Sequence, residues 1–124
     1  MQQKFSLQRI LSLLKKSNIV SKIEIISIDE IAGRSVYRIR CSLIPSKYKL
    51  EVKFIKTERE FIYSYQLFTD KPIIRWDNAP HYPDIRTYPH HFHDRNGNVI
   101  ESDLKGIVID DLNIILRSIK KMLR

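Results

Sequence analysis

The sequence lacks several features that would point to a particular class of protein. Its single cysteine, Cys41, cannot form an internal disulfide. Charged residues interrupt the longest apolar stretches well before they reach the length of a membrane-spanning helix. The segment 1–16 lacks the continuous apolar block of a signal peptide, and the chain contains no repeat, low-complexity tract or obvious linker. These absences favour a cytoplasmic protein without a membrane segment.

The length and the charge of the chain narrow its class further. At 124 residues the chain has the size of one domain, so we expect a single domain over 1–124. It carries 22 basic and 14 acidic residues, which gives a formal net charge of +8. A protein of that charge attracts polyanions, and nucleic acid is the most abundant polyanion of the cytoplasm. The charge therefore indicates nucleic-acid binding, but a basic protein neutralised by an acidic partner would have the same composition.

Apolar residues recur at helical spacing near both ends of the chain. The first set predicts an amphipathic helix over about 3–16, and its members are Phe5, Leu7, Ile10, Leu11 and Leu14. The second set predicts a helix over about 107–123, and its members are Val108, Leu112, Ile115, Ile119 and Leu123. In this second helix acidic residues come early and basic residues late, as the helix dipole favours.

The chain between these two segments has the pattern of strands. The segment 19–31 is rich in β-branched residues, and Ile25-Ile26 breaks its alternation, which indicates a bulge or a strand apolar on both faces. Further strands are predicted over 37–43, 48–54, 61–68 and 73–76, and Asn96-Gly97 indicates a type I′ hairpin turn between 88–94 and 98–101. The connections are too short for crossover helices. We therefore expect an α+β fold with a curved antiparallel sheet of five or more strands, packed by N-terminal and C-terminal helices.

All four histidines and three of the five prolines lie in the segment 75–98. Histidine has an unperturbed pKa close to neutrality and is a common metal ligand, so this cluster indicates a site. RNA cleavage by its own 2′-hydroxyl requires only a proton acceptor, a proton donor and a cation that stabilises charge on the phosphate. The candidate catalytic residues are His81, His90, His91, His93, Arg75, Asp77 and Arg86.

Other interpretations of this segment stay open. If 88–94 is extended, His91 and His93 share one face and can chelate zinc, with His81 or Asp84 brought near by the turn. The chain has one distant cysteine and no His-Glu-x-x-His motif, which argues against a structural zinc site, so we expect no metal or other cofactor. Some histidines would instead cap the hairpin, and Asp77-Asn78 would start the loop as an Asx turn.

A second group of residues would contact the RNA itself. Basic residues on the polar faces of two strands are candidates for a track of phosphate contacts, although a solvated face explains each one alone. An exposed pair of tyrosines would stack on bases, but their spacing with Phe61 and Leu67 makes core packing the better interpretation. The candidate RNA-binding residues are Arg38, Arg40, Lys49, Lys53, Tyr63 and Tyr65.

The stretch Arg75-Trp76-Asp77-Asn78-Ala79-Pro80-His81-Tyr82-Pro83, followed by Thr87-Tyr88-Pro89-His90-His91-Phe92-His93, resembles the toxins of TumE-type toxin–antitoxin systems. Members of that family carry an Arg-aromatic-Asp-Asn-Ala-Pro-His-His-Pro segment and then a Pro-His-His-x-His segment. Tyr82 stands where the family has its second histidine. The resemblance implies a small cytoplasmic toxin that acts on RNA or translation and is encoded beside an antitoxin with a helix-turn-helix domain.

We therefore expect a toxin with metal-independent ribonuclease activity, that is, an endoribonuclease-type hydrolase. His90 or His93 would act as the base, another histidine as the acid, and Arg75 or Arg86 would stabilise the phosphate. One alternative is a non-catalytic module that binds RNA or a protein partner through a basic sheet face. Another is a metal-dependent phosphodiesterase or nucleotidyltransferase that uses the His-x-His pair.

Overall fold

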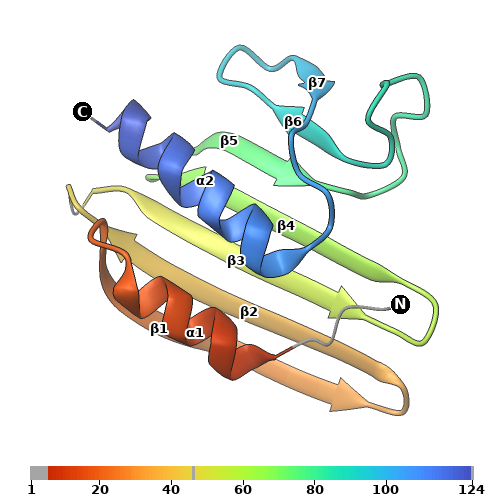
Figure 1. Cartoon of the computed structure of the whole chain (residues 1–124), viewed down its shortest axis with the longest axis horizontal. Coiled ribbons are helices and arrows are strands. Elements are labelled where there is room, and N and C mark those ends of the chain that lie inside the picture. Colours follow the sequence, from red (N-terminus) through yellow and green to blue (C-terminus); the bar gives the residue numbers. More distant parts are fainter. Residues whose placement is uncertain (1–5, 46, 124) are drawn as a thin grey trace.

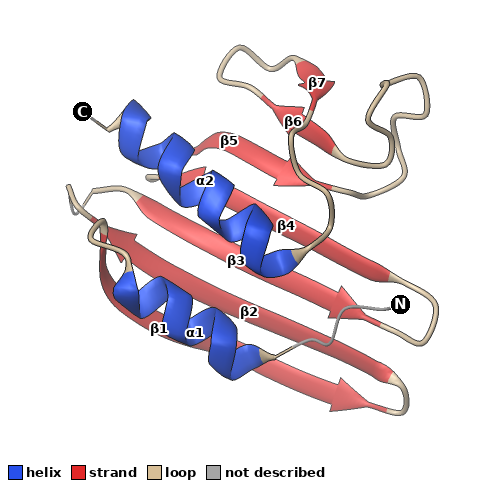
Figure 2. Ribbon diagram, viewed as in Figure 1, coloured by secondary structure: helices blue, strands red, loops and turns tan. Residues whose placement is uncertain are grey.

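In the part of the chain that the structure describes, seven antiparallel strands form one open sheet, and two helices cover one of its faces (Figure 1). The computed structural model describes residues 6–45 and 47–123. Its elements in chain order are α1 (Leu7–Lys16), β1 (Val20–Ile31), β2 (Arg34–Leu43), β3 (Lys49–Lys56), β4 (Phe61–Phe68), β5 (Pro72–Asp77), β6 (His91–His93), β7 (Val99–Glu101) and α2 (Val108–Met122). Each strand pairs with its neighbour in sequence, so the sheet is a meander (Figure 2). The expected antiparallel α+β fold is confirmed.

The alternation of side chains along the strands decides which face of the sheet is covered. On β2, Ile39 and Cys41 are fully buried, whereas Arg38 and Arg40 beside them are only partly buried. Residues directly opposite each other in an antiparallel pair lie on the same face. The row Ile39, Val52, Tyr65, Trp76 therefore runs across the covered face, under the helices. The row Arg38, Lys53, Ser64, Asp77 runs across the other face, which we call the open face.

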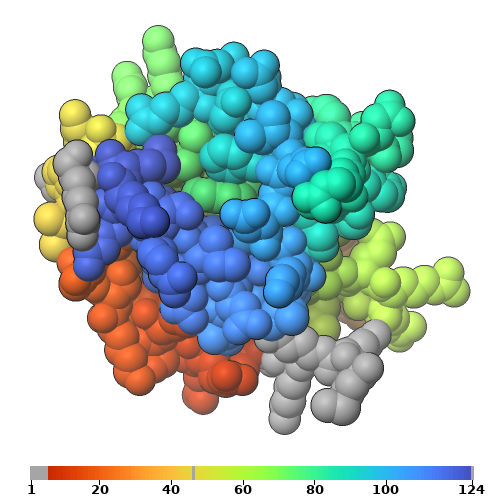
Figure 3. Space-filling view, turned by 45° about the horizontal axis from the view of Figure 1, so that its top comes forward, coloured from red at the N-terminus to blue at the C-terminus, as the bar shows by residue number. Residues whose placement is uncertain are grey.

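Both helices bury an apolar stripe against the sheet and lie next to each other in the space-filling view (Figure 3). In α1 the buried residues include Ile10 and Leu14, and the helix begins where the Ser6 side chain accepts a hydrogen bond from the Arg9 N–H at 3.3 Å. In α2, Leu112, Ile115 and Ile119 are fully buried. Both helices are thus confirmed. The part of the first predicted helix before Ser6 lies outside the described residues.

Two local features of the sheet test the expectations from sequence. The register between β1 and β2 shifts between Ile25 and Ser27, which confirms the bulge at Ile25-Ile26. The prediction of a type I′ turn at Asn96-Gly97 is wrong. That turn requires positive φ at both residues, but among the described residues other than glycine only Ala32 has a positive φ.

The β6–β7 hairpin instead closes with a longer loop that Asp94 stabilises. Gly97 has a φ of +82°, and its N–H donates to the Asp94 carbonyl at 3.2 Å, while the Asp94 N–H donates to the Asn98 carbonyl at 2.9 Å. This is a β-turn followed by a left-handed glycine, the common three-residue hairpin. The Asp94 carboxylate also accepts from the N–H groups of Asn96 and Asn98 at 2.9 Å each. These side-chain hydrogen bonds favour the longer loop over the two-residue turn.

Candidate active site

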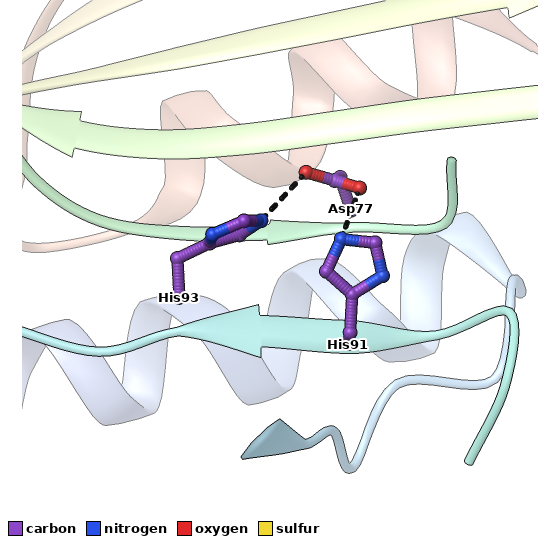
Figure 4. Close-up of side chains that lie close together, drawn as sticks. All are labelled: Asp77, His91 and His93. Atoms are coloured by element: carbon purple, nitrogen blue, oxygen red, sulfur yellow. Dashed lines mark ion pairs between the residues drawn. The ribbon is translucent and has the colours of Figure 1, made fainter. Parts of the chain in front are cut away.

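Asp77 and two histidines meet on the open face where β5 pairs with β6 (Figure 4). The register places His91 opposite Asp77 and His93 opposite Arg75. Both imidazole rings point toward the Asp77 carboxylate (Figure 4). His91 Nε2 lies 2.7 Å from Asp77 Oδ1, and His93 Nε2 lies 3.4 Å from Asp77 Oδ2. The four residues Arg75, Asp77, His91 and His93 are called the Asp77 cluster below.

Arg75 contacts both the carboxylate and one histidine of this cluster. Its Nε donates to Asp77 Oδ2 at 2.8 Å, and its Nη2 lies 3.0 Å from His93 Nε2. A guanidinium has donors only, so His93 Nε2 must accept this hydrogen bond, and the ring proton of His93 resides on Nδ1. Burial and the neighbouring positive charge of Arg75 lower the pKa of His93, and the negative charge of Asp77 opposes them. His93 is therefore a neutral imidazole near neutral pH.

His91 is the most deeply buried histidine of the described residues, with 1% of its surface exposed. Its Nδ1 lies 3.0 Å from the Pro89 carbonyl oxygen. A carbonyl can only accept, so Nδ1 carries the hydrogen. On the other side of the ring, Nε2 is buried and makes no hydrogen bond of good geometry within the described part of the chain, despite its 2.7 Å contact with Asp77. His91 thus holds a buried nitrogen that the protein leaves without a well-aligned partner.

Asp77 and Asn78 also start the loop that connects β5 to β6. Asp77 Oδ1 accepts a hydrogen bond from the Ala79 N–H at 3.1 Å, so the expected Asx turn is present in addition to the contacts in the cluster. Asn78 extends the pairing with β4: its Oδ1 accepts from the Tyr63 N–H and its Nδ2 donates to the Phe61 carbonyl, both at 2.8 Å. The loop is therefore attached to the sheet directly beside the Asp77 cluster.

A cleft of about 270 Å³ opens beside the cluster on the open face. Its lining includes Lys53, Ser64, Arg75, Asp77, His81, Tyr82 and His91. The ring of Tyr82 lies over the two histidines, with its centroid 4.7 Å from that of His91 and 5.9 Å from that of His93. His81 is exposed and belongs to the same loop. The fold thus brings five of the seven candidate catalytic residues together: Arg75, Asp77, His81, His91 and His93.

The other two candidate catalytic residues, His90 and Arg86, do not join this group. His90 lies on the covered side, where its Nδ1 is 2.6 Å from the Tyr63 hydroxyl. Burial raises the pKa of Tyr63 and lowers that of His90, so the neutral phenol donates to the neutral ring. Arg86 pairs with exposed Glu101 at the surface through two hydrogen bonds of 3.0 and 2.8 Å. One step along an extended chain reverses the face of a side chain, which separates His90 from His91.

The candidate RNA-binding residues divide between the two faces of the sheet. Arg38 and Lys53 share a row with Ser64 and Asp77, and Arg40 shares the next row with Arg75. Glu51 partly neutralises this surface, since it contacts Arg38 at 2.8 Å and Arg40 at 3.4 Å. Lys49 lies on the same face, opposite Phe68. The basic residues therefore lie together on the open face beside the Asp77 cluster.

Tyr63 and Tyr65 are on the covered face, where they are 1% and 0% exposed. Their ring centroids are 5.1 Å apart, and Tyr65 also packs edge-on against Phe54. No base can reach either ring, so the expectation of base stacking is corrected to packing in the core. The reason is the alternation of β4, which points the larger apolar side chains toward the helices.

Two residues that border the cleft were not among the candidates from sequence. Ser64 faces Asp77 across β4 and β5, and its position between two core tyrosines is the pattern signal that places it on the open face. Tyr82 lies over the imidazole rings, and the sequence signals for that position are its place inside the histidine-rich segment and its match to the family's second histidine.

The fold and the site define a small α+β protein that presents a histidine–carboxylate cluster on the open, basic face of a meander sheet. The chain belongs to the TumE toxin family, because the family model described as Toxin TumE matches residues 10–123. It is thus a toxin component of a toxin–antitoxin system and has an antitoxin as its partner. No curated protein and no solved structure matches the chain. Among the described residues, no helix is both long and apolar enough to cross a membrane.

Proposed function

We propose that this toxin cleaves RNA in the cytoplasm without a metal ion, at the Asp77 cluster. The observation that carries the proposal is the neutral His93 held 3.0 Å from the Arg75 guanidinium, beside a cleft on a basic sheet face. A base and a phosphate-binding cation are thereby adjacent, as cleavage of RNA by its own 2′-hydroxyl requires. The fold and the family support a toxin, and the arrangement of these side chains supports this chemistry.

RNA would lie along the open face with its phosphates near the basic residues. Lys53 lines the cleft and lies two strands away from Asp77 in the same row. Arg38 and Arg40 extend the positive surface toward the far edge of the sheet. Phosphate contacts of this kind position a nucleic acid without reading its sequence. Because the tyrosines of β4 are buried, charge rather than stacking would supply the affinity.

In the proposed reaction His93 removes the proton of the 2′-hydroxyl, and the 2′-oxygen then forms a bond to phosphorus. The bond from phosphorus to the 5′-oxygen breaks, and His81 donates a proton to that leaving oxygen. The products are a 2′,3′-cyclic phosphate and a free 5′-hydroxyl. We assign the proton donor to His81 because it is exposed in the cleft, whereas His91 is only 1% exposed. Arg75 would turn from His93 Nε2 toward the phosphate and stabilise its charge.

Asp77 and His91 would position these groups rather than contact the substrate. Asp77 accepts from Arg75 Nε at 2.8 Å, and this hydrogen bond aims the guanidinium at His93. His91 is 1% exposed and packs against the carboxylate, with its Nε2 2.7 Å from Asp77 Oδ1. A buried carboxylate with several contacts holds its partners in a narrow range of geometries.

A cleavage assay in excess EDTA tests the proposal directly. Purified chain incubated with labelled RNA should produce fragments that end in a 2′,3′-cyclic phosphate, and His81→Ala should lower the rate. Intact RNA that migrates as a complex would instead support the non-catalytic binding module. Cleavage that appears only after a divalent metal is added would support the metal-dependent phosphodiesterase, which the convergence of Asp77, His91 and His93 within 4.8 Å also fits.

The contribution of Lys53 to RNA binding should appear as a change in salt dependence. If Lys53 contacts one phosphate, Lys53→Gln should reduce the log–log slope of affinity against salt by about 0.7 for single-stranded RNA. Fluorescence anisotropy at several salt concentrations measures that slope. Lys120→Gln is the matched control, since Lys120 is exposed on α2, over the covered face. Equal slopes for Lys53→Gln and the unmodified chain would rule out the open face as the RNA-binding surface.

We further propose that the antitoxin carries a helix-turn-helix domain and an acidic segment that covers the open face. Such a segment would exclude RNA and neutralise the basic rows at once. Charge complementarity predicts that Arg38→Glu combined with Arg40→Glu weakens the complex with the antitoxin. Unchanged affinity in a pull-down titration would place the antitoxin on another surface.

A further inference from the structure

We propose that Asp77, His91 and His93 bind a divalent transition-metal ion of the Zn²⁺ class, and that the bound ion switches the cleft off. The binding site itself is argued from the geometry of the cluster alone. The inhibitory effect rests on the proposed metal-independent cleavage. No step of the cleavage chemistry requires this ion.

The three side chains already lie at the spacing of a metal site. One ligand atom from each residue can be chosen so that all three lie within 4.8 Å of one another. In tetrahedral zinc sites the bonds to nitrogen and oxygen are about 2.0–2.2 Å, which places neighbouring ligand atoms roughly 3.3 Å apart. His93 Nε2 and Asp77 Oδ2 are 3.4 Å apart, close to that spacing. Two histidines and one carboxylate are a common protein ligand set for zinc with an open fourth position.

The buried surroundings of His91 favour its use as a metal ligand. The Pro89 carbonyl holds the ring hydrogen on Nδ1, so in the neutral ring the lone pair is on Nε2. Metal-binding histidines typically donate their second nitrogen to a carbonyl or carboxylate in this way. His91 Nε2 lies only 2.7 Å from Asp77 Oδ1, and it makes no well-aligned hydrogen bond within the described residues. A metal ion bound between the His91 ring and the Asp77 carboxylate would give this buried nitrogen a partner.

Arg75 now contacts the atoms that the metal ion would use. Its guanidinium donates to Asp77 Oδ2 at 2.8 Å and to His93 Nε2 at 3.0 Å. The side chain is 40% exposed, so it can leave the cluster toward solvent without disturbing the core. The metal ion and the Arg75 guanidinium would therefore compete for the same lone pairs.

This competition explains why the metal ion would inhibit. A nitrogen that coordinates a metal cannot accept a proton, so His93 would no longer act as the base. Asp77 would also release Arg75, and the guanidinium would lose the orientation that aims it at the phosphate. One bound ion would thus remove both functions from the cleft.

Calorimetric titration of the full chain with Zn²⁺, in the absence of RNA, tests the binding site. We expect one ion per chain, and at least tenfold weaker binding for His93→Gln and for Asp77→Asn, because each removes one of three ligands. Arg75→Ala should bind Zn²⁺ more tightly than the unmodified chain, because the competing cation is gone. His81→Ala and His90→Ala are matched controls outside the ligand set. Their affinity for Zn²⁺ should stay within about twofold of that of the unmodified chain, whereas a tenfold loss of affinity corresponds to about 1.4 kcal/mol.

Weak binding to the unmodified chain, or equal affinity for His93→Gln and the controls, would overturn the metal site. Circular dichroism of each variant shows whether a loss of binding reflects unfolding, and the Arg75→Ala gain cannot arise from unfolding. For inhibition, stoichiometric Zn²⁺ should stop RNA cleavage and EDTA should restore it. Faster cleavage with Zn²⁺ would overturn the inhibitory role. If no cleavage occurs under any condition, the proposed function fails, while the calorimetric result still decides the metal site.

Discussion

His93→Ala is expected to lower the rate of RNA cleavage by about 10² to 10⁴-fold, because a general base typically contributes that much. The substitution removes the neutral nitrogen that lies 3.0 Å from Arg75 Nη2. His93 is only partly buried, so the fold should survive its truncation. Initial rates on labelled RNA in EDTA measure the effect, and growth inhibition at matched expression gives the second readout.

His90→Ala is the matched control for that experiment. His90 is close to His93 in sequence but contacts Tyr63 on the covered side of the sheet. Its loss should reduce stability, because the Tyr63 hydroxyl would lose its partner, but the rate per folded molecule should stay within about threefold of the unmodified chain, far below the 10²-fold loss of a general base. The cleavage rate of Arg75→Lys should also be low, because an ammonium group cannot replace the two hydrogen bonds that the guanidinium makes with Asp77 and His93. Equal loss in His90→Ala and His93→Ala would contradict the assignment of the base.

Ile115→Ala is expected to reduce the free energy of unfolding by about 2–5 kcal/mol. Ile115 is 0% exposed and lies in the stripe by which α2 packs on the sheet. Truncation removes buried methyl groups and leaves a cavity that a packed helix fills only in part. Chemical denaturation followed by circular dichroism measures the change.

Ile31→Ala is the same chemical change at an exposed position. Ile31 is 68% exposed at the end of the edge strand β1, so its truncation should change stability by less than about 0.5 kcal/mol. The difference between the two variants isolates burial from the chemistry of the substitution. A small effect at Ile115 would show that α2 is not packed on the core as in this structure.

The periodicity of the sequence predicted most of the sheet and both helices. Strands β2 to β5 alternate over most of their length, so the spacing of residues such as Ile39 and Cys41 shows the covered face without any tertiary contact. The loop of the hairpin after β6 was predicted wrongly, because Asn96-Gly97 fits both a two-residue turn and a three-residue loop. The hydrogen bonds that the Asp94 carboxylate accepts from the N–H groups of Asn96 and Asn98 distinguish the two, and they exist only once the loop has closed.

The sequence by itself determined the α+β class, the two faces of the sheet and the segment that contains the candidate site, because these depend on side-chain periodicity and on composition. Only the tertiary structure decided that Asp77 meets His91 and His93 while His90 faces the core. That choice depends on the register between β5 and β6, which are separated by an irregular loop. Asn78 attaches the start of that loop to β4, but an irregular loop of this length has no single turn geometry from which the sequence would fix the register of the two strands.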